Sequence, residues 1–150
     1  MRSEPNVFKA RAWVALALLL AAAAAGDAEP AALIDLPVAD RELIAAAQWR
    51  DAEVRAARMG SPVEIALAVA GAFEGRQQLI VQVNEGAEAS SAARVTVIRD
   101  GLLDDAVRSQ RWDIEFTRTA AGAWQVRQVR KAWRCWRGSV SAGFGAQPCP

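Results

Sequence analysis

The sequence of 150 residues contains no histidine and no tyrosine, and it has only two cysteines. Without histidine the chain cannot form the Ser-His-Asp or Cys-His sites that many hydrolases use. Two cysteines alone do not complete a structural zinc site, and here they do not form a Cys-x-x-Cys redox motif. Neither common glycine-rich phosphate loop is present. We therefore expect no metal and no cofactor, and any catalysis would depend on carboxylates, lysine or arginine.

Residues 1–25 have the order of a secretory signal peptide. A basic segment is followed by an uncharged apolar run over residues 14–25 and then by small residues. At about 1.5 Å per residue this run is too short to cross a hydrocarbon core of roughly 30 Å, so we expect membrane attachment only if the segment stays uncleaved. Cleavage after Ala25 or Ala28 would release a periplasmic or secreted protein. A buried alanine-rich helix is the alternative, but it does not explain the basic flank.

The remaining chain divides into three parts. Residues 26–39 contain two prolines and are predicted to form a linker or arm. Residues 40–137 are predicted to form one α+β domain. Residues 138–150 are rich in glycine, serine and proline and are expected to be an irregular tail.

Charge is distributed unevenly along this chain. Residues 27–105 contain seven basic and fourteen acidic residues, whereas residues 106–150 contain eight basic and two acidic residues. Two interpretations are open. The halves can pack together and neutralise each other across neighbouring strands, or the basic half can present a face to an anionic partner.

Two helices are predicted first. One covers residues 41–59, where apolar side chains recur every three or four residues and charged side chains such as Glu53 are expected on the solvent side. The second begins with Ser61, Pro62 and Glu64, the pattern of a capping box, and runs to about residue 74. Because this second helix is apolar on most sides, we expect it to lie closest to a sheet.

About four antiparallel strands should follow, because the apolar period changes to two. The segments concerned are residues 78–83, 93–97, 112–117 and 124–137. Two helices packed on one face of a curved antiparallel sheet of this kind form an α+β fold.

The turn between the last two strands can be assigned from the sequence. A three-residue loop over 120–122 places Gly122 in the left-handed region and pairs Phe116 with Val126, so that apolar residues face one another. The apolar period then changes phase once, which predicts a bulge near residues 127–128.

Three carboxylates are candidates for general-base chemistry. Asp100 lies in an acidic loop, and Asp113 and Glu115 share the polar face of a strand. A pair with separated pKa values would support acid–base catalysis. The alternative is an acidic loop and a strand face exposed to solvent.

Cations, Lys131 among them, and aromatic residues alternate in the last strand. The candidate binding residues are Arg130, Trp133, Arg134, Trp136 and Arg137. Such a surface would hold an anionic glycan, a lipid headgroup or a peptide through charge and cation–π contacts. Nucleic acid is not expected as a partner, because the protein is predicted to be exported. The alternative is that Trp133 faces the core while arginine stems cover the sheet edge.

The two cysteines lie near the C-terminus. In an oxidising compartment, and without metal partners, Cys135 and Cys149 are predicted to form a disulfide. The bond would hold the tail against the end of the last strand, where Phe144 would cover the sheet or the mouth of a pocket.

The segment "RWDIEFTRTAAGAWQVRQVRKAW" resembles the closing hairpin of NTF2-like domains, in which a glycine turn precedes Trp-x-Val. Here these residues are Gly122, Trp124 and Val126. The resemblance implies a cone-shaped α+β fold in a family that includes isomerases, dehydratases and many exported noncatalytic members. Isomerases of the family use a pocket tyrosine, which this chain lacks. Cystatin-like domains share the same helix-on-sheet arrangement and remain an alternative.

Taken with the missing catalytic side chains, these patterns predict a small exported domain without catalytic activity. It would bind a small ligand or an envelope protein in a pocket between the helices and the sheet. One alternative is an isomerase- or hydrolase-type enzyme with a carboxylate base. Another is an envelope adaptor held by an uncleaved N-terminus.

Overall fold

The computed structural model describes residues 33–86, 90–138 and 142–150. The predicted signal peptide and both cleavage sites lie outside these residues. The helices and strands, in chain order, are β1 (Glu42–Leu43), α2 (Arg50–Ala56), α3 (Pro62–Ala70), β2 (Gln77–Glu85), β3 (Ala92–Asp100), β4 (Val107–Arg118) and β5 (Trp124–Cys135). Short 3-10 turns flank α2 at Ala46–Gln48 and Ala57–Met59.

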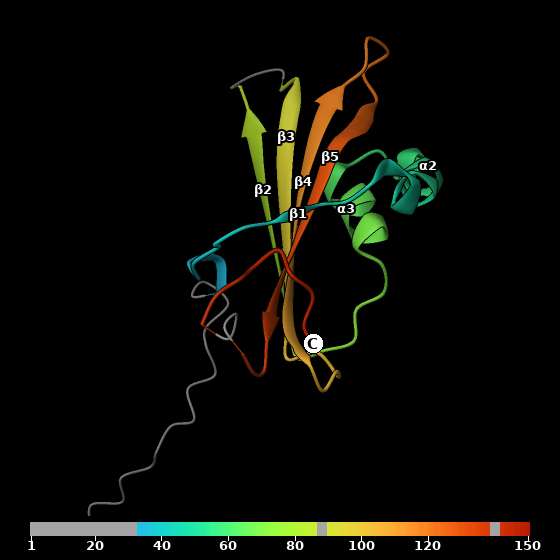
Figure 1. Cartoon of the computed structure of the whole chain (residues 1–150). Coiled ribbons are helices and arrows are strands. Elements are labelled where there is room, and N and C mark those ends of the chain that lie inside the picture. The colour runs from blue at the N-terminus through green and yellow to red at the C-terminus, as the bar shows by residue number, and fades with distance from the viewer. Residues whose placement is uncertain (1–32, 87–89, 139–141) are drawn as a thin grey trace, which may run out of the picture.

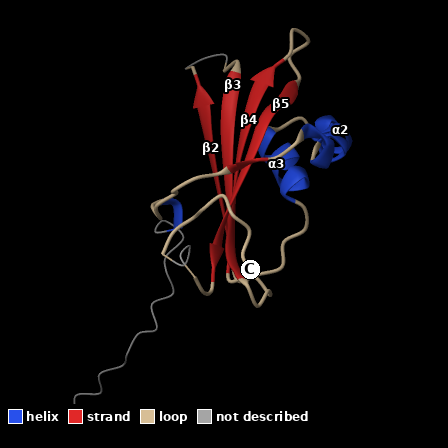
Figure 2. Cartoon of the chain, in the orientation of Figure 1, coloured by secondary structure: helices blue, strands red, loops and turns tan. Residues whose placement is uncertain are grey.

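The five strands form one antiparallel sheet in the order β1-β5-β4-β3-β2. Helices α2 and α3 lie on one side of the sheet, and the segments near the two chain ends cross the other side (Figures 1 and 2). We call these sides the helix face and the outer face. The α+β class predicted from the sequence is confirmed. Among the described residues, no helix has the length and apolar character needed to cross a bilayer.

The segment predicted as one helix over residues 41–59 is divided, which corrects that prediction. Residues 42–43 pair with residues 130–131 as strand β1, and the Ile44 N–H donates to the Val129 carbonyl at 2.9 Å. This pairing satisfies backbone groups along the edge of β5 that a helix at the same residues would leave without partners. The sheet therefore has five strands instead of about four.

Helix α3 begins as the capping box predicts. The Ser61 hydroxyl accepts a hydrogen bond from the Glu64 N–H at 3.2 Å, and Pro62 lies in the first turn. The helix ends earlier than predicted, at Ala70. Its C-terminal neighbour Gly71 has a φ of 78°, a value that residues with a Cβ rarely adopt.

The hairpin between β4 and β5 has the predicted turn. Thr119 donates its N–H to the Ala123 carbonyl at 2.8 Å, and Gly122 has a φ of 81°. Phe116 pairs with Val126, as the apolar pattern requires. Both the loop length and the register are confirmed.

The predicted bulge in β5 is also present. Glu115 pairs with Gln128, whereas the next residue of β4, Phe116, pairs with Val126. Arg127 is therefore the extra residue, and it reverses which side chains of β5 face the helices.

The main core lies on the helix face. Helix α3 contacts β2, β3 and β4, whereas α2 contacts α3 more than any strand, so the predicted order of the layers is confirmed. The sheet contributes alternate residues of three strands, namely Ala93, Val95, Val97, Ile114, Phe116, Val126 and Val129.

A smaller core lies on the outer face. Leu33, from the segment predicted as a linker or arm, is fully buried there with Ile98 of β3 and Ala132 of β5. Phe144 of the tail completes this cluster and is 1% exposed. Both segments near the chain ends therefore cover the sheet.

The tail is fastened as the cysteines predict. Cys135 and Cys149 form a disulfide with a Cα–Cα distance of 5.6 Å. Between them, Gly145 exchanges two backbone hydrogen bonds with Trp133, each of 2.9 Å. The tail thus extends the pairing along the edge of β5 beyond β1.

Candidate functional site

A cavity of about 260 Å³ lies on the helix face, where β1 and the following turn approach β4 and β5. It occupies the place predicted for a pocket, between the helices and the sheet. We call it the aromatic pocket. Its lining residues are Glu42, Ile44, Gln48, Trp49, Val69, Trp112, Lys131 and Trp133.

Strand geometry explains why aromatic residues meet here. Trp112 of β4 and Lys131 of β5 are direct cross-strand partners, and Trp133 follows Lys131 on the same face because strand side chains alternate. Trp49 is held on the opposite wall, where its indole N–H donates to the Ile44 carbonyl at 3.2 Å. The three indoles therefore come from β4, β5 and the segment before α2.

The Lys131 ammonium lies between two aromatic faces. Its Nζ is 4.2 Å from the ring centroid of Trp112 and 4.9 Å from that of Trp133. Burial lowers the pKa of Lys131; Glu42 opposes this shift, and the charge of Arg99 adds to it. Within the described residues, no hydrogen bond or ion pair engages this ammonium, so its three donors are without partners there.

A second donor in the pocket wall is also unused. The indole Nε1 of Trp112 is buried and has no hydrogen-bond partner among the residues that the structure describes. Buried polar groups usually have partners, and a donor left without one is costly. The pocket therefore has two donors without hydrogen-bond partners among the described residues, the Trp112 N–H and the Lys131 ammonium, beside one lining carboxylate, Glu42.

The predicted basic and aromatic binding residues do not form one surface. Alternation along β5 places Trp133 in the aromatic pocket and Arg130 and Arg134 on the outer face. Arg134 is 5% exposed and donates to Asp100 at 2.9 Å, so it is a buried structural cation. Burial, followed by the charge of nearby Arg108, lowers the pKa of Arg134, whereas Asp100 raises it.

The last two predicted binding residues lie beyond the end of β5. Trp136 is half-exposed, donates its indole N–H to the Asp104 carbonyl at 3.0 Å, and lies 5.1 Å from the Arg108 guanidinium. Arg137 is exposed. Neither residue lines the aromatic pocket.

The three predicted catalytic carboxylates lie outside the aromatic pocket. Asp100 accepts from Ser109 and from Arg134. Asp113 is buried and accepts from Thr96 at 2.7 Å and from Arg111.

Glu115 lines the outer face. The aromatic pocket instead has Glu42 as its lining carboxylate. The carboxylates considered for base chemistry therefore do not share a cavity with the three indole rings.

Sequence reasoning counted Lys131 among the alternating cations and aromatic residues of the last strand, but it did not select Trp49, Trp112 or Glu42 as site residues. A signal for Trp112 was present, because the period-two pattern after the bulge places Lys131 beside Trp133, opposite Trp112. Glu42 carried no such signal, since its segment has the pattern of a helix.

No protein-family model, curated protein or solved structure matches this chain. The resemblance to NTF2-like domains therefore stays a prediction. The structure establishes the coarser statement that the chain is an α+β protein in which two helices pack on a five-stranded antiparallel sheet.

Proposed function

We propose that the protein is an exported domain that binds a small organic anion in the aromatic pocket without transforming it. The observation that carries this proposal is the Lys131 ammonium, held between the Trp112 and Trp133 rings with its donors unused by the described residues. A carboxylate placed against Lys131 would supply the acceptors that this donor lacks.

The pocket wall also indicates the rest of the ligand. The indoles of Trp49, Trp112 and Trp133 offer flat apolar surface, which suits an aromatic or planar body. The unused Trp112 N–H offers a further donor to the carboxylate or to a neighbouring oxygen. The volume of about 260 Å³ is slightly below the range of roughly 300–1,000 Å³ typical of drug-sized ligands. We therefore infer a ligand with one ring and one acidic group.

Two features support export. The N-terminal sequence has the order of a signal peptide, and both cysteines are joined in a disulfide, which persists mainly in oxidising compartments. We place the mature protein in the periplasm or outside the cell. An NTF2-like architecture, with the ligand between helices and sheet, is part of the same proposal.

A matched ligand series tests the proposed function. Phenylacetate, phenylacetamide and phenethylamine have the same ring and differ in the charge of the polar end. Titration monitored by tryptophan fluorescence and by ligand-observed NMR should show binding of phenylacetate, weaker binding of the amide and none of the amine.

Two variants identify the groups responsible. Lys131→Met should abolish the preference for the carboxylate, and Trp112→Phe should weaken binding while keeping an aromatic face. Arg118→Gln, which removes an exposed cation stacked on Trp124, is the control and should bind as the parent does. Equal binding of acid and amine, or undiminished binding by Lys131→Met, would refute the proposal.

A further inference from the structure

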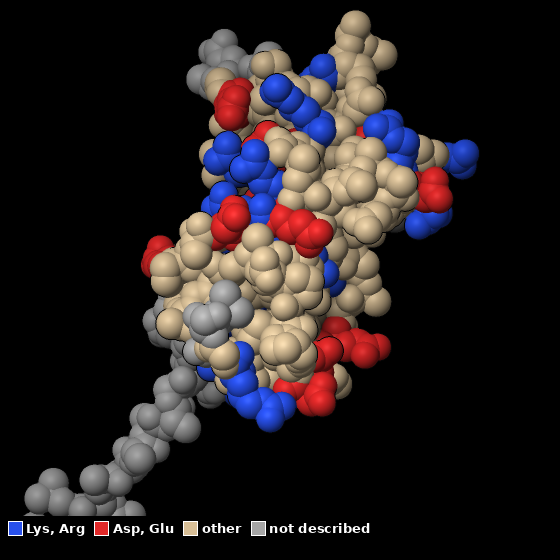
Figure 3. Space-filling view, in the orientation of Figure 1, with Lys and Arg blue, Asp and Glu red and all other residues tan. Residues whose placement is uncertain are grey.

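A second hollow, of about 390 Å³, lies on the outer face, on the other side of the sheet from the aromatic pocket. We call it the arginine groove. Its charged lining residues are Arg41, Arg94, Arg111, Arg130, Asp113 and Glu115. Figure 3 shows basic side chains gathered over this side of the molecule, with acidic side chains at their border.

The strands bring these charges together through their register. Arg94 of β3 is paired with Glu115 of β4, and Asp113 of β4 is paired with Arg130 of β5. All four side chains occupy outer-face positions because strand side chains alternate. Arg41, from the segment before β1, also lines the groove.

Asp113 is fully engaged within this cluster. It accepts hydrogen bonds from the Thr96 hydroxyl at 2.7 Å and from the Arg111 guanidinium at 3.0 and 3.2 Å. Arg41 approaches the same carboxylate, with Nε 2.8 Å from Oδ2. The Asp113 carboxylate therefore positions Arg41 and Arg111 and has little capacity for further donors.

The other arginines have donors to spare. Within the described residues, neither Arg94 nor Arg130 forms an ion pair. Arg130 donates through Nε and Nη2 to the neutral side-chain carbonyl of Gln128 at 2.8 and 3.1 Å, which leaves its Nη1 donors for a ligand. Arg41 Nε is buried and, despite its short distance to Asp113, lacks the geometry of a hydrogen bond. Four arginines against two carboxylates leave the groove with an excess of two positive charges.

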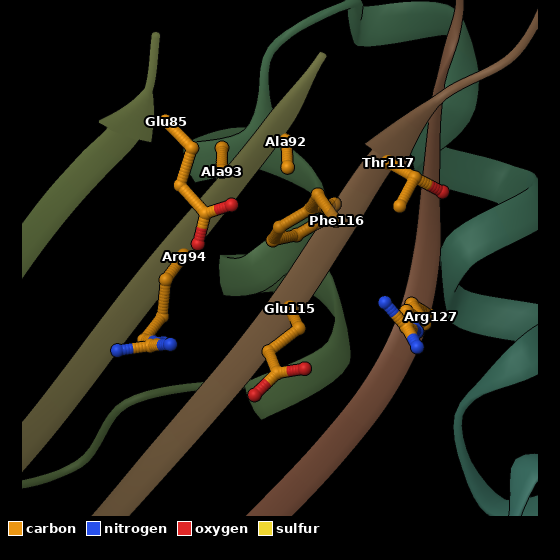
Figure 4. Close-up of a pocket in the computed structure, with 8 residues that line it drawn as sticks. All are labelled: Glu85, Ala92, Ala93, Arg94, Glu115, Phe116, Thr117 and Arg127. Carbon is orange, nitrogen blue, oxygen red and sulfur yellow. The ribbon is translucent and has the colours of Figure 1, made fainter. Parts of the chain in front are cut away.

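The charge balance changes toward one end of the groove. There Arg94 and Glu115 also line a smaller hollow of about 60 Å³ with Glu85 and Arg127. Figure 4 shows Arg94 and Glu115 extending in the same direction from neighbouring strands. Two carboxylates balance two arginines at this end, so the excess positive charge lies on the side of Arg41 and Arg130.

We propose that the arginine groove binds a phosphate monoester through Arg94, Arg130 and Arg41. Guanidinium groups present planar pairs of donors that match phosphate oxygens, and a dianionic group balances the excess charge. This site is on the opposite face from the aromatic pocket and does not depend on the function proposed for it.

Phosphate of this kind has two sources, a soluble phosphate ester or the headgroup of an acidic lipid. The test therefore has two arms at constant ionic strength. Glycerol 3-phosphate is titrated into the protein by calorimetry and NMR. Separately, the protein is sedimented with phosphatidylcholine vesicles that contain or lack phosphatidic acid.

The variant for both arms is Arg94→Gln combined with Arg130→Gln. The control is Arg55→Gln combined with Arg58→Gln, which removes the same charge from exposed positions around α2. Circular dichroism melting should show that both double variants are folded. We expect the groove variant to lose about ten-fold or more in affinity, because it removes direct charge-assisted hydrogen bonds to the phosphate. The control should lose less than about two-fold, because salt screens exposed charges that lie far from the ligand.

The outcomes separate the two sources. Binding of glycerol 3-phosphate that depends on Arg94 and Arg130 identifies a soluble ester. Dependence on these residues in the vesicle arm alone identifies the lipid headgroup. Absence of binding in both arms, or equal losses in the groove and control variants, would overturn the proposal. Lys131→Met should leave phosphate binding unchanged, which distinguishes a failure here from a failure at the aromatic pocket.

Discussion

Glu53 of α2 accepts a hydrogen bond from the backbone N–H of Val126 in β5, with an Oε1–N distance of 2.6 Å. Glu53 is only 6% exposed, although the helix pattern predicted it on the solvent side. That prediction was wrong because the periodicity of apolar residues in a helix gives no information about a backbone N–H of a distant strand, here that of Val126, which needs an acceptor. The contact joins α2 directly to the strand, one residue before the bulge at Arg127.

Replacing this carboxylate should destabilise the fold. We expect Glu53→Ala to lower the free energy of unfolding by about 2 kcal/mol, since the Val126 N–H would stay buried without an acceptor. Glu53→Gln keeps an acceptor and should cost less. Urea denaturation measures both. Asp51→Ala, at an exposed position of the same helix, is the control, and an equal loss in it would contradict this role for Glu53.

Arg99 should be a second determinant of stability. Its guanidinium donates to the carbonyls of Ala70, Gly71 and Ala72 at 2.6–3.0 Å, where α3 ends, and it is 4% exposed. Burial lowers its pKa. Arg99→Met should reduce the free energy of unfolding by about 2–3 kcal/mol, because a charged group bonded to several carbonyls is lost.

Chemical denaturation is the measurement for Arg99→Met as well. Exposed Arg55→Met is the control, and surface substitutions of this kind usually change stability by less than about 0.5 kcal/mol. If Arg99→Met lowered the free energy of unfolding by no more than a surface substitution does, water would be replacing the guanidinium at the carbonyls where α3 ends, and the role assigned to Arg99 would be wrong.

Loss of the disulfide should affect the tail and the whole domain. The bond between Cys135 and Cys149 closes a short loop, for which the chain-entropy model gives about 3 kcal/mol. Cys149→Ser should therefore lower the melting temperature. In the parent protein neither cysteine should react with iodoacetamide until a reductant is added. Alkylation of the parent protein without reductant would contradict the bond.

Lys131 should titrate below the ordinary lysine range. The sequence has one other lysine, Lys9, so reductive ¹³C-methylation gives a simple NMR spectrum that Lys131→Met assigns. The methyl signal should report a lower pKa in the folded protein than in urea, because burial disfavours the ammonium. A folded pKa at or above the value in urea would exclude this desolvation.

The same shift sets the sign of a stability change with pH. The folded protein releases the Lys131 proton at lower pH than the unfolded chain does. The free energy of unfolding should therefore rise with pH between the lowered pKa and the usual lysine value near 10.5. Lys131→Met should remove this contribution, and the difference between the two unfolding curves measures it.

Local sequence rules predicted much of this fold. The capping box at Ser61 and the glycine turn at Gly122 depend on a few adjacent residues, and the bulge at Arg127 follows from a single change of phase. The disulfide followed from counting cysteines. Each of these features is specified by neighbouring residues or by exclusion of alternatives.

Features that depend on distant partners were harder to predict. Strand β1 forms because residues 42–43 can pair with the free edge of β5. The sequence of residues 42–43 alone does not indicate this pairing. The predicted binding strand contained the right chemistry, yet alternation divides it between two faces, so that Lys131 and Arg130 serve different hollows. Applying the alternation of strand side chains to the residues after the bulge would have placed Lys131 and Arg130 on opposite faces of the sheet.

The contact between the two chain ends has a consequence for the order of events during folding. Val38 and Phe144 are bridge partners, and Phe144 and Leu33 together bury Ile98 and Ala132. These contacts join the most distant described parts of the chain, and such pairings form late because they close the longest loops. While the chain is being synthesised, the part of the outer face that Phe144 covers stays exposed until that residue arrives. A nascent chain halted before Phe144 would present that surface to chaperones, although every strand of the sheet had already emerged.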